Sequence, residues 1–319
     1  MMHKKWLIIA ASLIVAGIVI FAGVMTMLNW DFSKLSTSKF ETNSHNITEP
    51  FTGISIHTDT ADIEFIPSAD GNCVVTCYES ENEKHSVAVK DGVLDIQLVD
   101  EKKWYQYIGF NFSAPKITVS LPVDEYESLT IDASTGDVKI EDSFRFETAD
   151  ISLSTGDISV KNISGNSMYL TVSTGKISAG TISCTGDLQA KVSTGKTTLT
   201  DITCSNLTAS GSTGKIKLEQ VTVSEKCTIT RSTGNVELIN STAGTFHIKT
   251  STGNVEFEQS DANELNIETS TGDVEGTLLT EKVFIIDTST GDIDVPESIT
   301  GGKCKITTST GDISIRFVN

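Results

Sequence analysis

Two columns of acidic side chains are the residues in this sequence whose type and spacing could do chemistry. An aspartate follows a Ser-Thr-Gly sequence at Asp137, Asp157, Asp273, Asp292 and Asp312. Carboxylates are preferred ligands of Ca²⁺, so this column could bind calcium. However, lysine takes the same position at Lys176, Lys196 and Lys215, and the glycine-rich nonapeptide of calcium-binding rolls is absent. We therefore expect no metal ion and no cofactor.

The second column, Glu237, Glu256 and Glu275, could act as acid and base on a polysaccharide. Such an enzyme needs loops that build a cleft, whereas the repeats around these acids have nearly constant length. No G-x-S-x-G, HExxH, G-x-G-x-x-G or P-loop motif occurs. The histidines are scattered along the chain, and only His247 lies within the repeats. We expect no enzyme, with a polysaccharide-active β-helix enzyme as the alternative.

The six cysteines could form disulfides or remain buried thiols. Cys184 and Cys204 both lie nine residues after the glycine of adjacent repeats, so a disulfide between them is possible. Small or apolar residues hold the same position elsewhere, which favours buried thiols. Cys227 and Cys304 lie four repeats apart, too far to join. Cys73 and Cys77 do not have a zinc-binding spacing, and could bridge neighbouring strands or stay free.

An aromatic segment lies ahead of the repeats and directly follows two lysines. Aromatic side chains next to lysine favour borders between protein and membrane, or between two proteins. The segment could therefore contact a partner or the membrane. Alternatively, it forms a hairpin that plugs the end of the core. Its aromatic residues are Trp104, Tyr105, Tyr107, Phe110 and Phe112.

A repeat of 19–20 residues must position these side chains. Ser-Thr-Gly, or a close variant, recurs with glycines at Gly136, Gly156, Gly175, Gly195, Gly214, Gly234, Gly253, Gly272, Gly291 and Gly311. Apolar residues recur two and four positions after each glycine, and five and seven positions before it. Alternation of this kind is typical of half-buried strands. We predict an all-β fold: a parallel β-solenoid of about ten coils, each built as strand, glycine corner, strand and return turn.

Pairs of threonines flank the serine of the last corners, at Thr250/Thr252, Thr269/Thr271, Thr288/Thr290 and Thr308/Thr310. An outward double ladder would resemble the surface of ice-binding solenoids. Earlier repeats place Leu153, Val172 and Val192 at the first of the two positions. We therefore expect both threonines to point inward with paired hydroxyls. The serines should form an outward polar ridge that could bind a linear polymer.

The N-terminus predicts a membrane anchor. Lys4 and Lys5 precede an uncharged run from Trp6 to Leu28, which as a helix would be about 35 Å long. This run is longer than the apolar part of a cleavable signal peptide, and no convincing cleavage site follows it. The lysines should stay inside, so we expect a single-pass protein of the cell membrane with its C-terminal domain extracytoplasmic.

The chain then divides into four regions. We expect a cytoplasmic stub and anchor at 1–30, a flexible stalk at 31–50, an irregular β cap at 51–130 and the solenoid at 131–319. Within the cap, Thr60-Ala61-Asp62 looks like a corner with alanine in place of glycine. The formal net charge of −18 at pH 7 argues against nucleic acid as a partner.

The Ser-Thr-Gly-Asp-Ile/Val repeat behind a signal-anchor helix resembles the bacterial putative-adhesin repeat domain family, a domain of unknown function that includes LiaG-like envelope proteins. The resemblance covers roughly residues 50–319 together with the anchor. It implies a β-solenoid, a location in the cell envelope and links to envelope-stress systems. It brings no catalytic residues.

These features predict a non-enzymatic, membrane-anchored envelope protein whose rigid solenoid binds a protein or a wall polymer. The alternative is an accessory or regulatory partner of a membrane sensor of envelope stress. The last strand, residues 312–319, should leave an open edge. We therefore expect end-to-end self-association or a partner that covers this edge.

Overall fold

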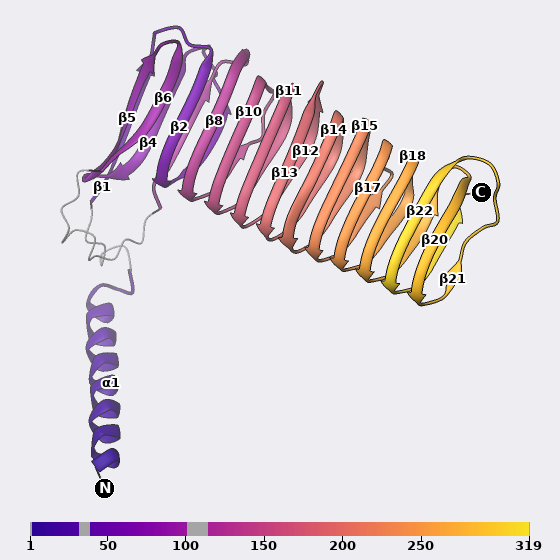
Figure 1. Ribbon diagram of the computed structural model, residues 1–319. Helices are drawn as coiled ribbons and strands as arrows, with labels where there is room; N and C mark the ends of the chain where they lie inside the picture. The colour runs from indigo at the N-terminus through magenta and orange to yellow at the C-terminus, as the bar shows by residue number, and fades with distance from the viewer. Residues whose placement is uncertain (1, 32–38, 101–113, 319) are drawn as a thin grey trace.

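The computed structural model describes residues 2–31, 39–100 and 114–318, which form one helix and one long rod of stacked strands (Figure 1). The helix is α1 (Met2–Met27). The strands before the regular repeats are β1 (Phe40–Ile47), β2 (Gly53–Thr60), β3 (Asp62–Pro67), β4 (Cys73–Ser80), β5 (Glu83–Lys90), β6 (Val93–Asp100) and β7 (Lys116–Leu121). Those of the repeats are β8 (Glu125–Thr135), β9 (Val138–Ile140), β10 (Phe144–Thr155), β11 (Ile158–Thr174), β12 (Ile177–Cys184), β13 (Asp187–Thr194), β14 (Thr197–Thr213), β15 (Ile216–Thr233), β16 (Val236–Ile239), β17 (Thr242–Thr252), β18 (Val255–Thr271), β19 (Val274–Leu278), β20 (Lys282–Thr290), β21 (Ile293–Asp294), β22 (Gly302–Thr310) and β23 (Ile313–Phe317).

The helix α1 is apolar on all sides. Its segment Lys5–Met27 has a mean hydropathy of 2.8 in its most apolar stretch, none of which is buried against the rest of the chain. By length and composition this helix could cross a bilayer.

The rod is a parallel β-solenoid, as predicted. Successive coils pair in parallel and in register, for example Ile151 with Leu170, and Ile158 with Ile177. The inward side chains of all coils form one continuous apolar core that runs from Ile54 to Ile315.

The glycine corners explain why the repeat cannot vary at that position. Each corner glycine of the repeats has a φ between +122° and +152°, a region that side chains other than glycine rarely adopt. The corners also stack closely: a Cβ on Gly195 would lie 1.7 Å from the carbonyl oxygen of Gly175. Both the backbone angle and the space therefore require glycine.

The aspartate column has a structural role at the same corners. The Asp137 Oδ1 accepts a hydrogen bond from the backbone N–H of Asp157 at 2.8 Å, and Asp157 Oδ1 accepts one from Lys176 N–H at the same distance. Asn235 and Asn254 make the corresponding bonds further along the rod. A short acceptor side chain thus satisfies the backbone N–H of the next coil.

Six successive coils of the rod have three sides, whereas the sequence predicted two strands and a turn. Six residues after the corner glycine, a residue other than glycine adopts a left-handed φ between +47° and +56° in six successive coils: Asn162, Thr181, Asp201, Gln220, Asn240 and Gln259. The chain bends there and forms a short third side, where Ile163 pairs with Ile182 and Ile182 with Ile202.

The order of coils departs from chain order at the far end of the rod. The coil of β22 and β23 lies between the coil of β18 and β19 and that of β20 and β21. The corners follow the same order, since the backbone N–H of Gly272 donates to the carbonyl oxygen of Thr310, and that of Gly311 donates to the carbonyl oxygen of Thr290. The prediction that residues 312–319 form the outermost edge is therefore wrong. β23 pairs with β19 along its length and with β21 at Ile313 and Ser314, and the outermost strands are β20 and β21.

The end near the helix shows the same departure from chain order. There β2 and β3 lie between β6 and β7 on one side and β8 and β9 on the other. Ala61 forms the corner of this inserted coil, and its N–H donates to Thr135. Antiparallel strands β5, β4 and β1 extend the two sides beyond β6 and β7. The stalk predicted at 31–50 is thus corrected over Phe40–Ile47, which is strand β1.

The threonine pairs also differ from the prediction. Thr250, Thr269 and Thr308 are buried, but their partners Thr252, Thr271 and Thr310 are exposed. The backbone turns toward the corner, so the serine and the second threonine both face solvent. The inward hydroxyls are not paired with one another: those of Thr269 and Thr308 donate to the backbone carbonyls of Gly253 and Gly272, and the buried oxygens of Thr250 and Thr288 have no hydrogen-bond partner.

One inward column contains an arginine, Arg231, only 1% exposed. Its guanidinium donates to the backbone carbonyls of Val192, Gly195 and Gly214 at 2.8–2.9 Å. Gly211 in the preceding coil provides the space, because a Cβ there would lie 1.9 Å from Arg231 Nη1. The buried charge is thus satisfied by backbone oxygens and has a structural role.

Candidate functional site

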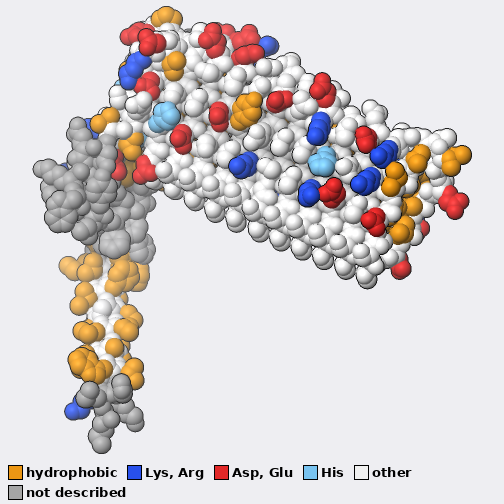
Figure 2. Space-filling view, viewed as in Figure 1, with side chains coloured by type: hydrophobic (Ala, Val, Ile, Leu, Met, Phe, Trp, Pro, Cys, Tyr) orange, Lys and Arg blue, Asp and Glu red, His pale blue; other side chains and the backbone are white. Residues whose placement is uncertain are grey.

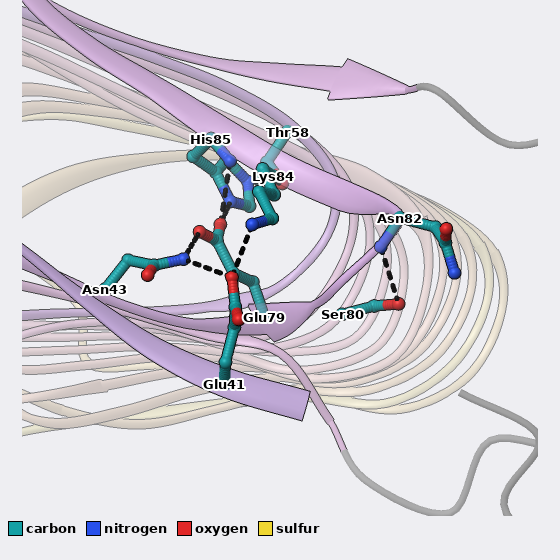
Figure 3. A network of polar contacts seen from close by, with 8 residues as sticks. All are labelled: Glu41, Asn43, Thr58, Glu79, Ser80, Asn82, Lys84 and His85. Atoms are coloured by element: carbon teal, nitrogen blue, oxygen red, sulfur yellow. Dashed lines mark hydrogen bonds and ion pairs between the residues drawn. The ribbon is translucent and has the colours of Figure 1, made fainter. Parts of the chain in front are cut away.

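A buried polar cluster lies between the two sides of the rod at the end near the helix (Figure 3). Its centre is the pair Glu79 on β4 and His85 on β5, which are 1% and 5% exposed. The turn at residues 81–82 carries the chain from one side to the other, so these two side chains meet across the core. We call Asn43, Thr58, Cys77, Glu79 and His85 the cap cluster.

Hydrogen bonds fix every polar group at the centre of the cap cluster. His85 Nδ1 lies 2.8 Å from Glu79 Oε2, and His85 Nε2 lies 2.9 Å from Thr58 Oγ1. The backbone N–H of His85 donates to the same Glu79 oxygen at 2.7 Å, while Asn43 Nδ2 donates to Glu79 Oε1 at 2.8 Å. A buried carboxylate with this many donors is well satisfied.

Cys77 adds a thiol to this arrangement. It lies two residues before Glu79 on β4, so both side chains point inward. One ligand atom from each of Cys77, Glu79 and His85 lies within 4.8 Å of the other two. Burial raises the pKa of the Cys77 thiol to about 12, and the neighbouring charge of Glu79 adds to the increase.

An exposed ion pair lies at the rim of the cap cluster (Figure 3). Lys84 Nζ lies 2.5 Å from Glu41 Oε1. The hydrogen bond from Lys84 lowers the pKa of Glu41 and raises that of Lys84. This pair is solvent-exposed and contributes little to stability.

A second candidate surface is the row of hydroxyls at the glycine corners. The threonine before each corner glycine is exposed and pairs with its counterpart in the next coil, as Thr174 does with Thr194 and Thr194 with Thr213. The adjoining serines are exposed at nearly every corner. We call this row, Ser134/Thr135 to Ser309/Thr310, the hydroxyl ridge. It offers two hydroxyls per coil at a spacing of about 4.8 Å.

The third side forms a shallow groove of about 620 Å³ across the first coils. Ile163 and Ile182 lie along its floor, and Asn162, Ser183 and Asp201 line it with polar groups. The groove covers only part of the rod, unlike the hydroxyl ridge.

The glutamate column lines a smaller hollow of about 360 Å³. Burial raises the pKa of Glu256, and the charges of Glu237 and Glu275 raise it further. Lys215 forms an ion pair with Glu237. The three acids lie on coils of equal length, with Val236, Val255 and Val274 in register beside them.

The predicted site residues are only partly described. Cys184 and Cys204 are both buried and lie in neighbouring coils, next to the paired Ser183 and Thr203. A disulfide between them stays a prediction. Trp104, Tyr105, Tyr107, Phe110 and Phe112 lie outside the described residues.

Sequence reasoning missed the cap cluster. His85 is one of five scattered histidines, and Cys77 was considered only with Cys73. The available signal was the alternation on β4, which places Cys77 and Glu79 on one inward face. A buried glutamate in such a strand requires a partner, but the sequence did not show that His85 would supply it.

Side-chain types are unevenly distributed on the face seen in Figure 2, where apolar side chains gather on the helix and at the distal end of the rod. The apolar residues exposed at the distal end include Leu279, Ile285, Ile293 and Ile299, with exposures from 45% to 94%.

Comparison with known proteins gives one family and several solved structures. The sequence profile of the family described as Toastrack DUF4097 matches residues 51–242 and 224–319. One similar structure is described as a putative adhesin from Bacteroides fragilis; it is 18% identical with a TM-score of 0.38, over 88% of this chain and 99% of that one. Two others are from Parabacteroides distasonis. One is described as a putative lipid binding protein, at 17% identity and TM-score 0.41, over 89% of this chain and 98% of that one. The other is described as a putative adhesin. It is 12% identical with a TM-score of 0.44, over 88% of this chain and 98% of that one. No curated protein matches the chain.

Proposed function

This chain belongs to the Toastrack DUF4097 family, and we propose that it is a non-enzymatic, membrane-anchored protein of the cell envelope. In this proposal the helix α1 holds the rod at the outer face of the membrane. The rod then binds an extended polymer of the envelope, a wall glycan or a protein segment, along its length.

The anchor rests on the exposure of α1. Apolar residues along most of the helix, such as Leu7 at 68% and Ile14 at 64% exposed, have no protein surface against them, whereas Met25 near its end is buried. Exposed apolar area on this scale is unfavourable in water and favourable in a bilayer. A signal sequence would have the same composition, so the experiment must distinguish retention from cleavage.

The observation that carries polymer binding is the hydroxyl ridge. It repeats the same pair of side chains at every coil, about 4.8 Å apart, so a polymer that lies along the rod meets the same two hydroxyls again and again. Hydroxyls donate and accept hydrogen bonds, which suits the hydroxyl and amide groups of glycans and extended peptides. The individual bonds are weak, and many repeats supply the affinity.

The anchor is tested in intact cells. We expect the full chain to remain in the membrane fraction after alkaline extraction, with its N-terminal residues still present by mass spectrometry. A protein that begins after residue 30 and is found in the medium would contradict the anchor. Binding by the rod could still hold in that case.

The ridge is tested with the full chain in detergent and purified insoluble wall glycan. We expect Thr213→Arg, together with Thr174→Arg, to reduce co-sedimentation several-fold, because bulky side chains interrupt the ridge. Thr208→Arg is the control, since Thr208 is also exposed on β14 but lies five residues before Thr213, outside the hydroxyl ridge. If the ridge variant and the control lose co-sedimentation equally, or if the unmodified chain does not bind the glycan, the wall-glycan assignment is overturned.

End-to-end self-association is also proposed, now through β20 and β21. Their edge exposes Ile285 at 47% and Ile293 at 51%. We expect sedimentation velocity of the full chain in detergent to show species larger than a monomer, which Ile285→Lys reduces. A monomer at high concentration would contradict it.

A further inference from the structure

We propose that the cap cluster is a site for one divalent transition-metal ion, with Zn²⁺ as the best-fitting ion, bound by Cys77, Glu79 and His85. This role is independent of the polymer-binding surface. The ion would lie between the two sides of the rod at the end near the helix.

The backbone brings the three ligands together. Cys77 and Glu79 occupy alternate inward positions of β4, and His85 comes from β5 after a tight turn. Their ligand atoms lie within 4.8 Å of one another, and the residues are 0%, 1% and 5% exposed. Among the residues that the structure describes, this is the one group of His, Cys, Asp and Glu side chains with such an arrangement.

The ligand types select the class of ion. A thiolate, an imidazole nitrogen and a carboxylate oxygen form a mixed donor set that suits Zn²⁺. Calcium and magnesium prefer oxygen ligands, so they fit poorly. A thiolate and a carboxylate also neutralise a doubly charged ion, which removes the cost of burying a net charge.

The neighbouring side chains would orient the ligands. Asn43 donates to Oε1 of Glu79, while Oε2 accepts from the His85 backbone N–H and would bind the ion in place of the His85 ring. Thr58 contacts His85 Nε2. Such partners fix the orientation of a carboxylate and the tautomer of a ligating histidine. With the ion at His85 Nδ1, the ring proton lies on Nε2 and is donated to Thr58 Oγ1.

The proton balance of binding follows from these assignments. The Cys77 thiol loses its proton to solvent as the sulfur–metal bond forms. The hydrogen bond from His85 Nδ1–H to Glu79 Oε2 is replaced by one bond from each of these atoms to the ion. The Nδ1 proton is lost to solvent and Nε2 takes one up, so the imidazole stays neutral. With neutral His85 and ionised Glu79, one proton is released for each ion bound, and no electron is transferred.

The first experiment titrates the purified full chain in detergent, stripped with a chelator, with Zn²⁺ and with Co²⁺ as a spectroscopic probe. We expect one tightly held Zn²⁺ per chain and a thiolate-to-cobalt absorption band. At a hundredfold excess over Kd, the melting temperature should rise by roughly 5 °C or more. Cys77→Ser should lose the band, and His85→Gln should weaken binding at least tenfold.

The matched control is Cys73→Ser. Cys73 is also buried on β4, four residues before Cys77, but is not in the ligand group. Its variant should keep the cobalt band and the stoichiometry. No uptake by the unmodified chain, or an unchanged band in Cys77→Ser, would overturn the site.

A measurement on the unmodified chain covers the case in which the variants do not fold. X-ray absorption of the Zn²⁺-loaded protein should show one sulfur at about 2.3 Å with nitrogen or oxygen at about 2.0–2.1 Å. A first shell of oxygen alone would place the ion on surface carboxylates and overturn the proposal.

Discussion

The two ends of the rod differ in how they finish the same core. Near the helix, the inward residues of the outermost coil, such as Leu94, Ile96 and Ile117, are 0% exposed. Strands β1, β4 and β5 and the cap cluster cover them. At the distal end, Phe284 and Ile286 of the outermost coil are only partly buried, and Ile293 is 51% exposed.

The difference separates two ways of ending a solenoid. One end adds antiparallel strands and a buried polar cluster, which close the core and leave little apolar surface. At the other end, among the residues that the structure describes, no strand covers β20 and β21, and the later strands β22 and β23 lie one coil inward. The first arrangement protects the outermost strands, while the second leaves them open.

The largest change in stability is expected from substitutions that test which of the two distal coils, β20–β21 or β22–β23, is interior. Ile306 on β22 pairs with Ile286 on β20, so the two occupy one column. We expect Ile306→Ala to lower the free energy of unfolding by about 4 kcal/mol, since Ile306 is 0% exposed. Ile286→Ala should cost about half as much. Denaturant unfolding measures both, and the reverse ranking would mean that β22 lies at the edge.

The corners give the next largest effect, because the first corner is made by Ala61 and the others by glycine. Gly195 has a φ of +141°. We expect Gly195→Ala to cost about 3 kcal/mol from the strained φ and the clash with Gly175. Ala61→Gly should cost only about 0.5–1 kcal/mol through chain entropy. Similar losses at both sites in thermal unfolding would show that the corners are equivalent after all.

Two buried threonines should change the stability in opposite directions when replaced by valine, and by smaller amounts. Thr58→Val removes the partner of His85 Nε2 in the closed end and should destabilise the protein by about 1–2 kcal/mol. Thr250 is 2% exposed and its hydroxyl has no partner, so Thr250→Val should stabilise it by about 1 kcal/mol. Urea midpoints that move in the same direction for both variants would contradict this contrast.

The smallest effect concerns Glu256, whose pKa is raised by burial and by its two glutamate neighbours. Since the folded protein holds this proton more tightly than the unfolded chain, the penalty is complete above the folded pKa and vanishes below about pH 4. We expect Glu256→Gln to stabilise the protein by about 0.2–1 kcal/mol at pH 7 and not at pH 4. Glu297→Gln, in an exposed loop, is the control that should show neither change.

The sequence predicted the glycine corners and the inward faces of the strands well, because the signals for both are local. Each corner needs a glycine, and each strand shows its inward face by alternation. The order of coils could not be predicted this way: glycines Gly272, Gly291 and Gly311 keep the regular interval although their coils are not stacked in that order. Equivalent repeats can pair in several orders, and side-chain pattern does not choose among them.

The cap cluster was hidden for a different reason. It depends on β4 and β5 belonging to opposite sides of the rod, which is a long-range property of the chain. Neither Glu79 nor His85 carries a sequence motif. The burial of Glu79 becomes apparent only when its three hydrogen bonds, one from Asn43 and two from His85, are seen together in space.

The inserted last coil has a consequence for biogenesis. The segment 282–294 cannot gain its neighbour until β22 and β23, which come later in the chain, have entered the space beside it. Completion of the distal part therefore waits for these later strands. A chain truncated before β22 would lack an internal layer, rather than being a slightly shorter rod, and quality-control proteases could recognise the defect.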